Sequence, residues 1–418
     1  MILQKASEHY DLAIIGAGLG GLLAAALASK HNKRVVILEK TSKVGGRFSG
    51  QLINGAQLSS GALHLIPHGS RGPLSKLLKQ VGIDVSIVES DVFCSLWTRD
   101  KHRTYATAKA FFLDLPKEAK KDGMKLLLLS KVRPNAKGSV QDMLDKYAKN
   151  SYVHDLTSAF INFSFSMSPS DLPWQEFCKF LDNLMMYKGP GIPYGGCRAI
   201  SHKLAEFVTI RNGSLLLQHK VTKIHLENGH WIVEYLHNGI RNRLSTTKVI
   251  SDIGSKQTKQ LLQANFNFSN YPKVARGFKV QFLSPTSLIA HKGIMFCIGT
   301  KRISGIVQVS NADPGLAPPG YHLLNTFQIA SSDAGTEKTL AMEDLKIIFP
   351  DTFDKLKFLS AELFDNTWPV NRAAQGYDLR SQKLAENFYL VGDETKPSGF
   401  IMAEGVASSV LAIKDAIV

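Results

Sequence analysis

Residues 10–47 read YDLAIIGAGLGGLLAAALASKHNKRVVILEKTSKVGGR, and this stretch decides the fold. An apolar run at 12–15 leads into a turn rich in glycine, which is followed by a helix-forming run of Ala and Leu. A second apolar run at 35–38 ends at Glu39. The order of strand, glycine turn, helix, strand and acidic residue is that of a dinucleotide-binding βαβ unit.

Four positions of this unit have a specific physical role. Gly16 lacks a Cβ and permits the tight turn from strand to helix, while Gly18 lets the backbone approach a pyrophosphate closely. Gly21 allows the helix to pack on the strand, and the N–H groups that begin the helix face the phosphates. Glu39 can accept hydrogen bonds from ribose hydroxyls. The alternative is a glycine-rich turn in an α/β protein that binds no dinucleotide.

Two segments outside the unit indicate which dinucleotide is bound. Lys40 and then a pair of glycines before an arginine (Gly45, Gly46 and Arg47) would place bare backbone and a cation beside the ligand. Near the C-terminus an apolar run at 388–391 ends at a Gly-Asp pair, and a helix rich in Ala and Gly is predicted from about residue 400.

In these motifs the chain resembles the FAD-dependent amine-oxidase and phytoene-desaturase superfamily. It is most similar to the phytoene-dehydrogenase-like oxidoreductases, which share stretches like those at 60–67, 191–197 and 368–374. The resemblance implies FAD as the cofactor and an α/β fold, in which a Rossmann-like FAD-binding domain of the glutathione-reductase type carries an inserted α+β substrate domain. One departure is the sequence Lys-Pro-Ser-Gly at 396–399, which replaces a His-Pro-Gly-like loop.

The resemblance also assigns cofactor contacts beyond the first unit. Asp393, after Gly392, would hold the ribityl and phosphate part, and the backbone at Ile401 and Met402 would face the flavin pyrimidine ring. Val221, at the start of a predicted strand, would meet the adenine through its backbone, or it is an ordinary core valine.

The chain is expected to form two domains that exchange segments. Residues 1–78, 197–262 and 376–418 are predicted to form the FAD-binding domain, and residues 79–196 and 263–375 the substrate-binding domain. The dipeptides Asn228-Gly229 and Asn238-Gly239 separate alternating apolar runs and predict two hairpins in the FAD-binding domain.

Composition and motif spacing limit the classes of partner that the protein is expected to bind. The net charge of +15 favours an anionic surface or substrate, although a protein that is merely basic would show the same balance. No nucleic-acid-binding module is recognisable, the four cysteines lack metal-ligand spacing, and no apolar run is long enough to cross a membrane. We therefore expect a cytoplasmic protein that binds neither metal nor nucleic acid and that could touch a membrane peripherally. The sequence does not indicate its oligomeric state.

The predicted substrate domain contains two apolar features. Residues 113–132 form a lysine-rich helix around a Leu run, which could lie on an anionic membrane or pack its leucines into the core. Residues 143–186 are predicted to be helical and rich in Phe and Met, which would line an apolar tunnel or simply fill the core.

Three residues are candidates for a catalytic role. Lys279 resembles the lysine that holds a water against flavin N5 in amine oxidases, or it is a strand-surface lysine. Trp368 would form a wall of the substrate site and Arg372 would fix substrate or flavin, with packing and salt bridging as alternatives. His64 and His68 could contact substrate or cofactor, or could be ordinary loop histidines.

The sequence thus predicts an FAD-dependent oxidoreductase that transfers hydride at a C–C bond of an apolar, isoprenoid or lipid-like substrate. An amine oxidase acting on a C–N bond is the first alternative. A non-enzymatic carrier of prenyl groups with the same fold is the second.

Overall fold

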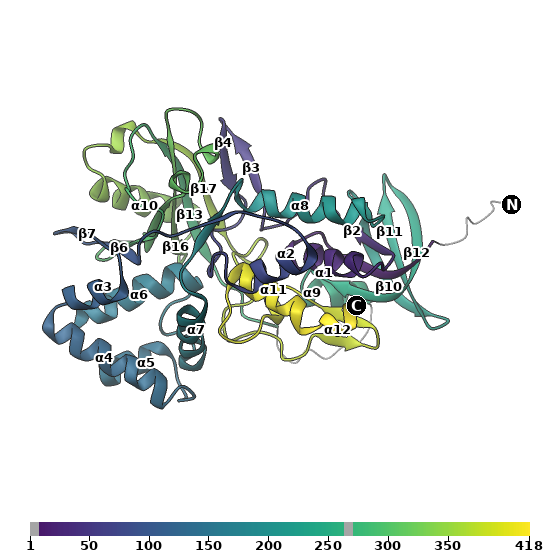
Figure 1. The fold of residues 1–418 in the computed structure, drawn as a ribbon, viewed down its shortest axis with the longest axis horizontal. Coiled ribbons are helices and arrows are strands. Elements are labelled where there is room, and N and C mark those ends of the chain that lie inside the picture. Colours follow the sequence, from purple (N-terminus) through teal and green to yellow (C-terminus); the bar gives the residue numbers. More distant parts are fainter. Residues whose placement is uncertain (1–7, 263–270) are drawn as a thin grey trace.

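The computed structural model describes residues 8–262 and 271–418. Its first layer is a parallel sheet in the order β9-β2-β1-β12-β19, in which β1 lies between β2 and β12 (Figure 1). The strands are β1 (His9–Ile15), β2 (Val35–Leu38), β9 (Ser214–Leu216), β12 (Ile240–Ser251) and β19 (Phe388–Leu390). Strands β1 and β2, with the helix α1 (Leu19–Lys30) between them, form the predicted strand–helix–strand unit. This is the predicted α/β fold.

An antiparallel extension continues the sheet beyond β12. It contains β10 (Lys220–Glu227), β11 (His230–His237) and, beside β19, the short β18 (Lys383–Ala385). Both predicted hairpins are confirmed, because Asn228-Gly229 joins β10 to β11 and Asn238-Gly239 joins β11 to β12, all four residues with positive φ. This conformation suits Asn and Gly and is typical of a tight type I′ hairpin.

A second sheet of seven strands lies at the other end of the molecule, in the order β17-β13-β16-β15-β14-β6-β7 (Figure 1). Its strands are β6 (Cys94–Trp97), β7 (His102–Tyr105), β13 (Gly277–Ser284), β14 (Met295–Cys297), β15 (Gly305–Gln308), β16 (His322–Ile329) and β17 (Lys357–Phe364). Helix α6 (Ser151–Phe165) contacts β14, β15 and β16, and α10 (Ala334–Ile348) contacts β13 and β17.

A layer of helices extends from the second sheet. It consists of α3 (Ala108–Asp114), α4 (Lys117–Val132), α5 (Val140–Tyr147), α6 and α7 (Trp174–Tyr187). The Ser139 hydroxyl accepts from the Asp142 N–H and the Asp142 carboxylate accepts from the Ser139 N–H, so that α5 begins with a capping box. Among the described residues no helix is both long and apolar enough to cross a membrane.

The remaining elements connect the two ends. They are β3 (Gly50–Ile53) and β4 (Ala56–Ser59), the pair β5 (Ile87–Glu89) and β8 (Gly191–Pro193), the helices α2 (Pro73–Val81), α8 (Gly196–Ile210), α9 (Ser255–Leu262), α11 (Met402–Ala412) and α12 (Lys414–Ile417), and the 3₁₀ turns Val309–Asn311, Pro314–Leu316, Phe353–Lys355 and Asp393–Thr395. Helices α2, α8 and α11 all contact α1, which is buried along nearly its whole length. The small residues of α1 are what let three helices surround it.

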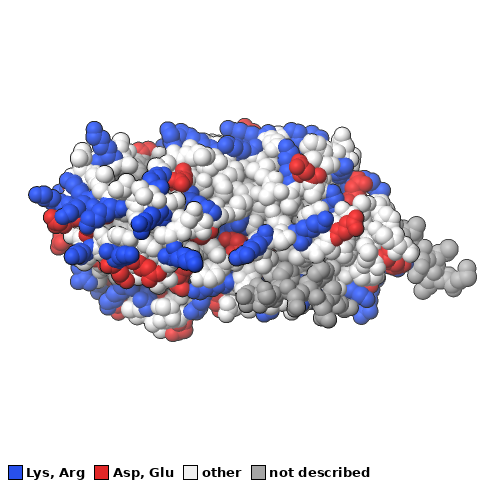
Figure 2. All heavy atoms as spheres, turned by 90° about the horizontal axis from the view of Figure 1, so that it is seen from below, with Lys and Arg blue, Asp and Glu red and all other residues white. Residues whose placement is uncertain are grey.

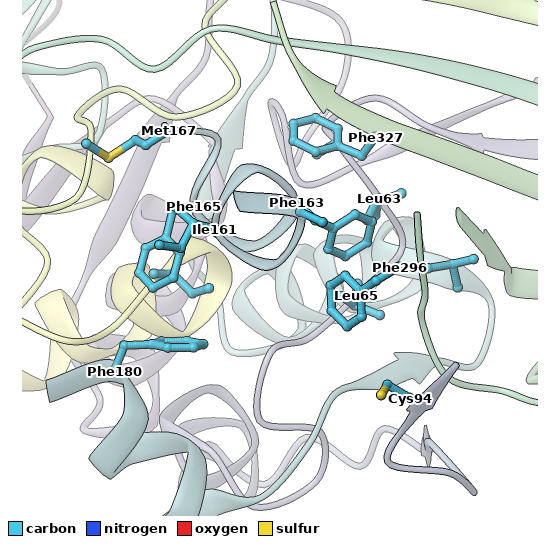
Figure 3. Close-up of a cluster of buried hydrophobic side chains, with 14 of the residues drawn as sticks. Leu63, Leu65, Cys94, Ile161, Phe163, Phe165, Met167, Phe180, Phe296 and Phe327 are labelled. Atoms are coloured by element: carbon cyan, nitrogen blue, oxygen red, sulfur yellow. The ribbon is translucent and has the colours of Figure 1, made fainter. Parts of the chain in front are cut away.

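The largest apolar cluster lies between the helical layer and the second sheet. Figure 3 shows part of it, with the Phe163 ring near Phe296 and Phe327 at centroid distances of 5.6 and 6.2 Å. Both pairs are edge-to-face, the arrangement that aromatic rings favour. The four cysteines are buried and unpaired.

At Gly21, α1 lies close against β1 and the turn that follows it. A Cβ at Gly21 would lie 2.2 Å from the Gly16 carbonyl oxygen, whereas a Cβ at Gly123 in α4 would meet nothing within 4 Å. We expect Gly21→Ala to lower the free energy of unfolding by about 1–3 kcal/mol through overpacking. We expect Gly123→Ala to raise it by about 0.5–1 kcal/mol, because alanine favours helix. Chemical denaturation of both variants tests this, and equal effects would contradict it.

Candidate active site

One continuous cavity of about 2020 Å³ runs from the parallel sheet to the helical layer. At the sheet end its walls are the glycine turn after β1, the end of β2 and the segments at 40–49, 219–221 and 392–393. At the other end its walls come from α3 to α7 and the second sheet. Ligand sites in proteins usually measure about 300–1,000 Å³, so this cavity has room for a large cofactor and a second molecule.

Bare backbone forms the sheet end of the cavity. Gly18 makes a parallel bridge to Gly45, whose N–H donates to the Ala17 carbonyl oxygen at 2.7 Å. A Cβ on Gly46 would lie 3.7 Å from the Gly18 Cα. The turn therefore exposes backbone at the N-terminus of α1, where N–H groups and the helix dipole favour phosphate. Gly21 does not line the cavity, in keeping with its packing role.

Glu39 is held at the end of β2 by two backbone amides. Its Oε2 accepts from the Ala17 N–H at 2.9 Å and its Oε1 accepts from the Thr41 N–H at 2.8 Å. Each oxygen keeps a lone pair, and the side chain faces the cavity with Lys40 and Val221. The carboxylate is thus oriented to accept from the hydroxyls of a ribose.

An ion pair closes the far side of this groove. Arg47 Nη2 lies 2.6 Å from Asp393 Oδ2, and Arg47 Nη1 donates to the Val370 carbonyl oxygen at 2.8 Å. The other Asp393 oxygen, Oδ1, is buried and has no partner among the described residues. Buried acceptors are normally satisfied, so this oxygen fits the hydroxyl of a bound ligand. Gly392 and Asp393 both line the cavity.

Helix α11 begins at the cavity. Ile401 is its N-cap, Met402 adopts φ +49° at its first position, and both residues line the cavity. A left-handed methionine costs of order 1 kcal/mol, and strained backbone of this kind is concentrated at binding sites. The start of α11 presents unpaired N–H groups, which suit the carbonyl oxygens of a flavin ring and would stabilise negative charge on it. The residues present therefore fit FAD.

The sequence did not single out Lys396 or Asp252. Lys396 is almost fully buried, and its ammonium lies 2.9 Å from the Ala373 carbonyl oxygen, 2.7 Å from that of Asp393 and 2.8 Å from the Asp378 carboxylate. It thus fixes the Asp393 loop from behind. The Asp252 carboxyl faces the cavity beside Gly18. A lysine in a loop and an aspartate after a strand carry no sequence signal for either position.

The helical end of the cavity is mostly apolar. Between residues 92 and 190, all of which the structure describes, no Asp or Glu lines it, although Lys109, Lys131 and Lys188 do, and Glu89 and Asp91 line the cavity just before this segment. We call this end of the cavity the apolar chamber. Its wall includes Phe160, Phe163, Phe177 and Phe180. Phe163 and Phe180 also belong to the buried apolar cluster, and other members of the Phe and Met stripe, such as Phe165, belong to that cluster without lining the cavity. Some residues of the Phe and Met stripe therefore line the cavity, while others only fill the core.

The three candidate catalytic residues occupy different places. Trp368 and Arg372 line the cavity, with Trp368 43% exposed. Lys279 is not a surface lysine, because it is fully buried and its ammonium donates to the Ser59 and Gly61 carbonyl oxygens behind the cavity wall. It does not itself line the cavity, so its contact with a water at the flavin stays a prediction.

The histidines His64 and His68 are also buried behind the wall and do not line the cavity. His64 bonds to the Gln57 carbonyl oxygen and accepts from the Cys197 N–H at 3.1 Å. His68 packs against the rings of Tyr187 and Phe400. Burial lowers the pKa of both histidines to about 4, so they are neutral at neutral pH.

Lys279 offers a test of its two roles. Burial lowers its pKa to about 8 in spite of Glu362, whose carboxylate lies 3.5 Å away. We expect Lys279→Met to lower the free energy of unfolding by about 1–3 kcal/mol, because two buried carbonyl groups lose their donor. A role at flavin N5 predicts in addition that air reoxidises the reduced protein more slowly in this variant, and in the wild type as the pH rises through about 8 and the cation is lost. An unchanged reoxidation rate in the variant would contradict that role.

Comparison with known proteins agrees with this geometry. The family model for flavin-containing amine oxidoreductases matches residues 19–412. An uncharacterised protein of Methanocaldococcus jannaschii is 33% identical over 407 residues, which is 96% of this chain and 98% of that protein. The crystal structure of an oxidoreductase from Methanosarcina mazei superposes with a TM-score of 0.88 at 29% identity, covering 97% of this chain and 99% of the other.

Putrescine oxidase shares the fold, with a TM-score of 0.76 at 15% identity over 98% of this chain and 99% of its own. The match of the family model spans nearly the whole chain, and the glycine turn, Glu39, Arg47 and Asp393 form the cofactor end of one cavity. The chain therefore belongs to the flavin-containing amine oxidoreductase family and is an FAD-dependent oxidoreductase.

Proposed function

We propose that the protein acts on a C–C bond of an apolar, lipid-like substrate. The observation that carries this proposal is the apolar chamber, which is continuous with the FAD groove in one cavity. FAD supplies a two-electron hydride acceptor when bound. In desaturation the substrate would lose a hydride to oxidised FAD and a proton from the adjacent carbon, and in saturation it would gain a hydride from reduced FAD and a proton. The chain would position that bond and exclude water from it.

The walls of the chamber suit a hydrocarbon. Phe, Leu and Met side chains surround it, and its charged lining residues between 92 and 190 are the cations Lys109, Lys131 and Lys188, which repel an ammonium, whereas Glu89 and Asp91 line the cavity just before this stretch. Bringing an unpaired ammonium into such a chamber costs several kcal/mol. An isoprenoid or acyl chain instead gains about 25 cal/mol for each Å² of apolar surface that it buries.

A match to a short stretch of another enzyme supports the same bond type. The human all-trans-retinol 13,14-reductase is 37% identical to this chain over 75 residues, which is 18% of this chain and 12% of that enzyme. Its name describes a reaction at a C–C bond of an isoprenoid. We propose the same class of substrate here, in the direction of either desaturation or saturation.

An amine oxidase acting on a C–N bond is the second candidate. It is favoured by the buried Lys279, which lies behind the wall at Gly61, and by the fold shared with putrescine oxidase. A prenyl-group carrier without redox chemistry has less support, because the cofactor end keeps Glu39 and the Arg47–Asp393 ion pair.

Blocking the chamber tests the proposal. Leu156 of α6 lines the chamber, and we expect Leu156→Trp to reduce turnover of apolar substrates roughly tenfold or more, because the reactive bond is displaced. Ile210→Trp, on the exposed surface of α8, is the matched control. Holoprotein would be mixed without oxygen with solubilised retinoids, acyclic isoprenoids and alkylamines, while flavin absorbance and product mass are followed. Reduction of the flavin by amines alone, equally fast in both variants, would contradict the proposal.

We further propose that the protein takes its substrate from an anionic membrane surface. Apolar residues at the mouth of the chamber are exposed, and they are Met124, Leu127, Leu128 and Met185. Exposed lysines of α4 flank them at 117, 121, 125 and 131. Figure 2 shows Lys and Arg at this end of the molecule, interspersed with Asp and Glu. Each basic residue near an anionic bilayer contributes about 1 kcal/mol.

The membrane contact is tested by cosedimentation with vesicles. We expect binding to anionic vesicles at low salt and its loss with zwitterionic vesicles. Leu128→Asp, 65% exposed, should weaken binding, whereas Leu226→Asp, 60% exposed on the distant strand β10, should not. Failure of the wild type to sediment with anionic vesicles, or equal effects of the two variants, would overturn this proposal.

A further inference from the structure

Asp252 is one of the residues that line the cofactor groove. It follows directly on β12, and its backbone N–H donates to the Ile15 carbonyl oxygen at 2.9 Å. This bond ties Asp252 to the last residue of β1, immediately before the glycine turn. The side chain lines the same cavity as Glu39 and Arg47.

The carboxyl lies directly on bare backbone. A Cβ at Gly18 would be 2.3 Å from Asp252 Oδ2, and Cβ atoms at Gly20 and Gly392 would each be 2.7 Å from Asp252 Oδ1. The missing Cβ atoms at these glycines make room for the Asp252 carboxyl itself, which thereby lies at the glycine turn, where the pyrophosphate of FAD would bind. A carboxylate at this place would repel the two phosphate charges.

The surrounding charges do not neutralise a carboxylate here. Arg47 and Arg372 face it, but no basic group of the described residues forms an ion pair with it, and Arg47 is engaged by Asp393. Asp393 faces it as well, and Glu394 contacts the same loop at Gly254. The remaining neighbours on β1 and α1 are uncharged.

The free protein already shifts Asp252 toward the neutral acid. Burial raises the pKa of Asp252 to about 7, and the negative charge of Asp393 acts in the same direction. The Gly21 amide and the two arginines act in the opposite direction. A neutral carboxyl has one O–H, which can donate to a phosphate oxygen where a carboxylate can only accept.

We propose that Asp252 is a cofactor-binding residue that acts as the protonated acid and donates a hydrogen bond to the pyrophosphate, so that FAD binding takes up one proton wherever the free protein holds Asp252 as the carboxylate. The inference rests on FAD as the cofactor and does not depend on the substrate. It adds to the binding groove a donor that is present only while the carboxyl keeps its proton.

The proposal fixes the sign of the pH dependence. Bound phosphate charges raise the pKa of Asp252 above its value in the free protein, so the complex holds more protons than its components. Below about pH 7 the acid is protonated in both states and affinity is constant. Above that value affinity falls by about tenfold for each pH unit, until the bound carboxyl itself loses its proton.

The experiment uses protein from which the flavin has been removed. FAD is titrated at about pH 6 and about pH 8.5 while flavin fluorescence is followed, and we expect the dissociation constant to rise by about tenfold or more. Calorimetry at the higher pH, in two buffers of different ionisation enthalpy, should show uptake of about one proton. Equal affinity at the two pH values, or no proton uptake, would overturn the proposal.

Two variants distinguish the contribution of Asp252 to the pH dependence of FAD binding from that of its neighbours. Asp252→Asn keeps the size of the side chain and a donor group, and should bind FAD with little pH dependence and without proton uptake. Glu39→Gln, in the same groove, should bind more weakly but keep the wild-type pH dependence. A wild-type profile in Asp252→Asn would overturn the proposal. The proton count on the wild type needs no variant to fold, and failure of the wild type to bind FAD at either pH would refute the cofactor assignment itself.

Discussion

The close approach of bare backbone at the glycine turn is the constraint on which the rest of the structure depends. Gly21 lets α1 rest on the Gly16 carbonyl, and Gly18 lies against Gly45. A side chain at these points would separate α1 from the sheet and close the groove. The central strand β1 carries this turn, and its neighbours β2 and β12 deliver Glu39 and Asp252 to the same edge.

The cofactor groove and the apolar chamber are two ends of one cavity, which is lined by both ends of the molecule. The segment at 60–65 forms wall near both the cofactor groove and the apolar chamber, and the Lys279 ammonium holds it from behind. In the proposed function, a substrate in the chamber would thereby lie next to a flavin in the groove. The exposed apolar residues of α4 and α7 mark where such a molecule would enter.

Local chemistry explains which features the sequence could predict. The glycine turn, the Asn-Gly hairpins and the capping box at Ser139 follow from backbone rules that act within a few residues. Asp252 and Lys396 could not be predicted, because each acquires its surroundings only when segments distant in the chain meet. Periodicity gave a Phe stripe but not the rotation of α6, which turns Phe163 to the chamber and Phe165 to the core. The domain bounds and the direct role of Lys279 stay predictions.

The central claim is that an apolar molecule in the chamber lies against the flavin. The measurement that tests it most directly is the visible absorption spectrum of the oxidised holoprotein during titration with an acyclic isoprenoid in detergent, because contact with the ring shifts its absorption bands. The account predicts a saturable shift that detergent alone does not produce. No shift with any apolar ligand, together with a saturable shift on adding a small alkylamine, would contradict it.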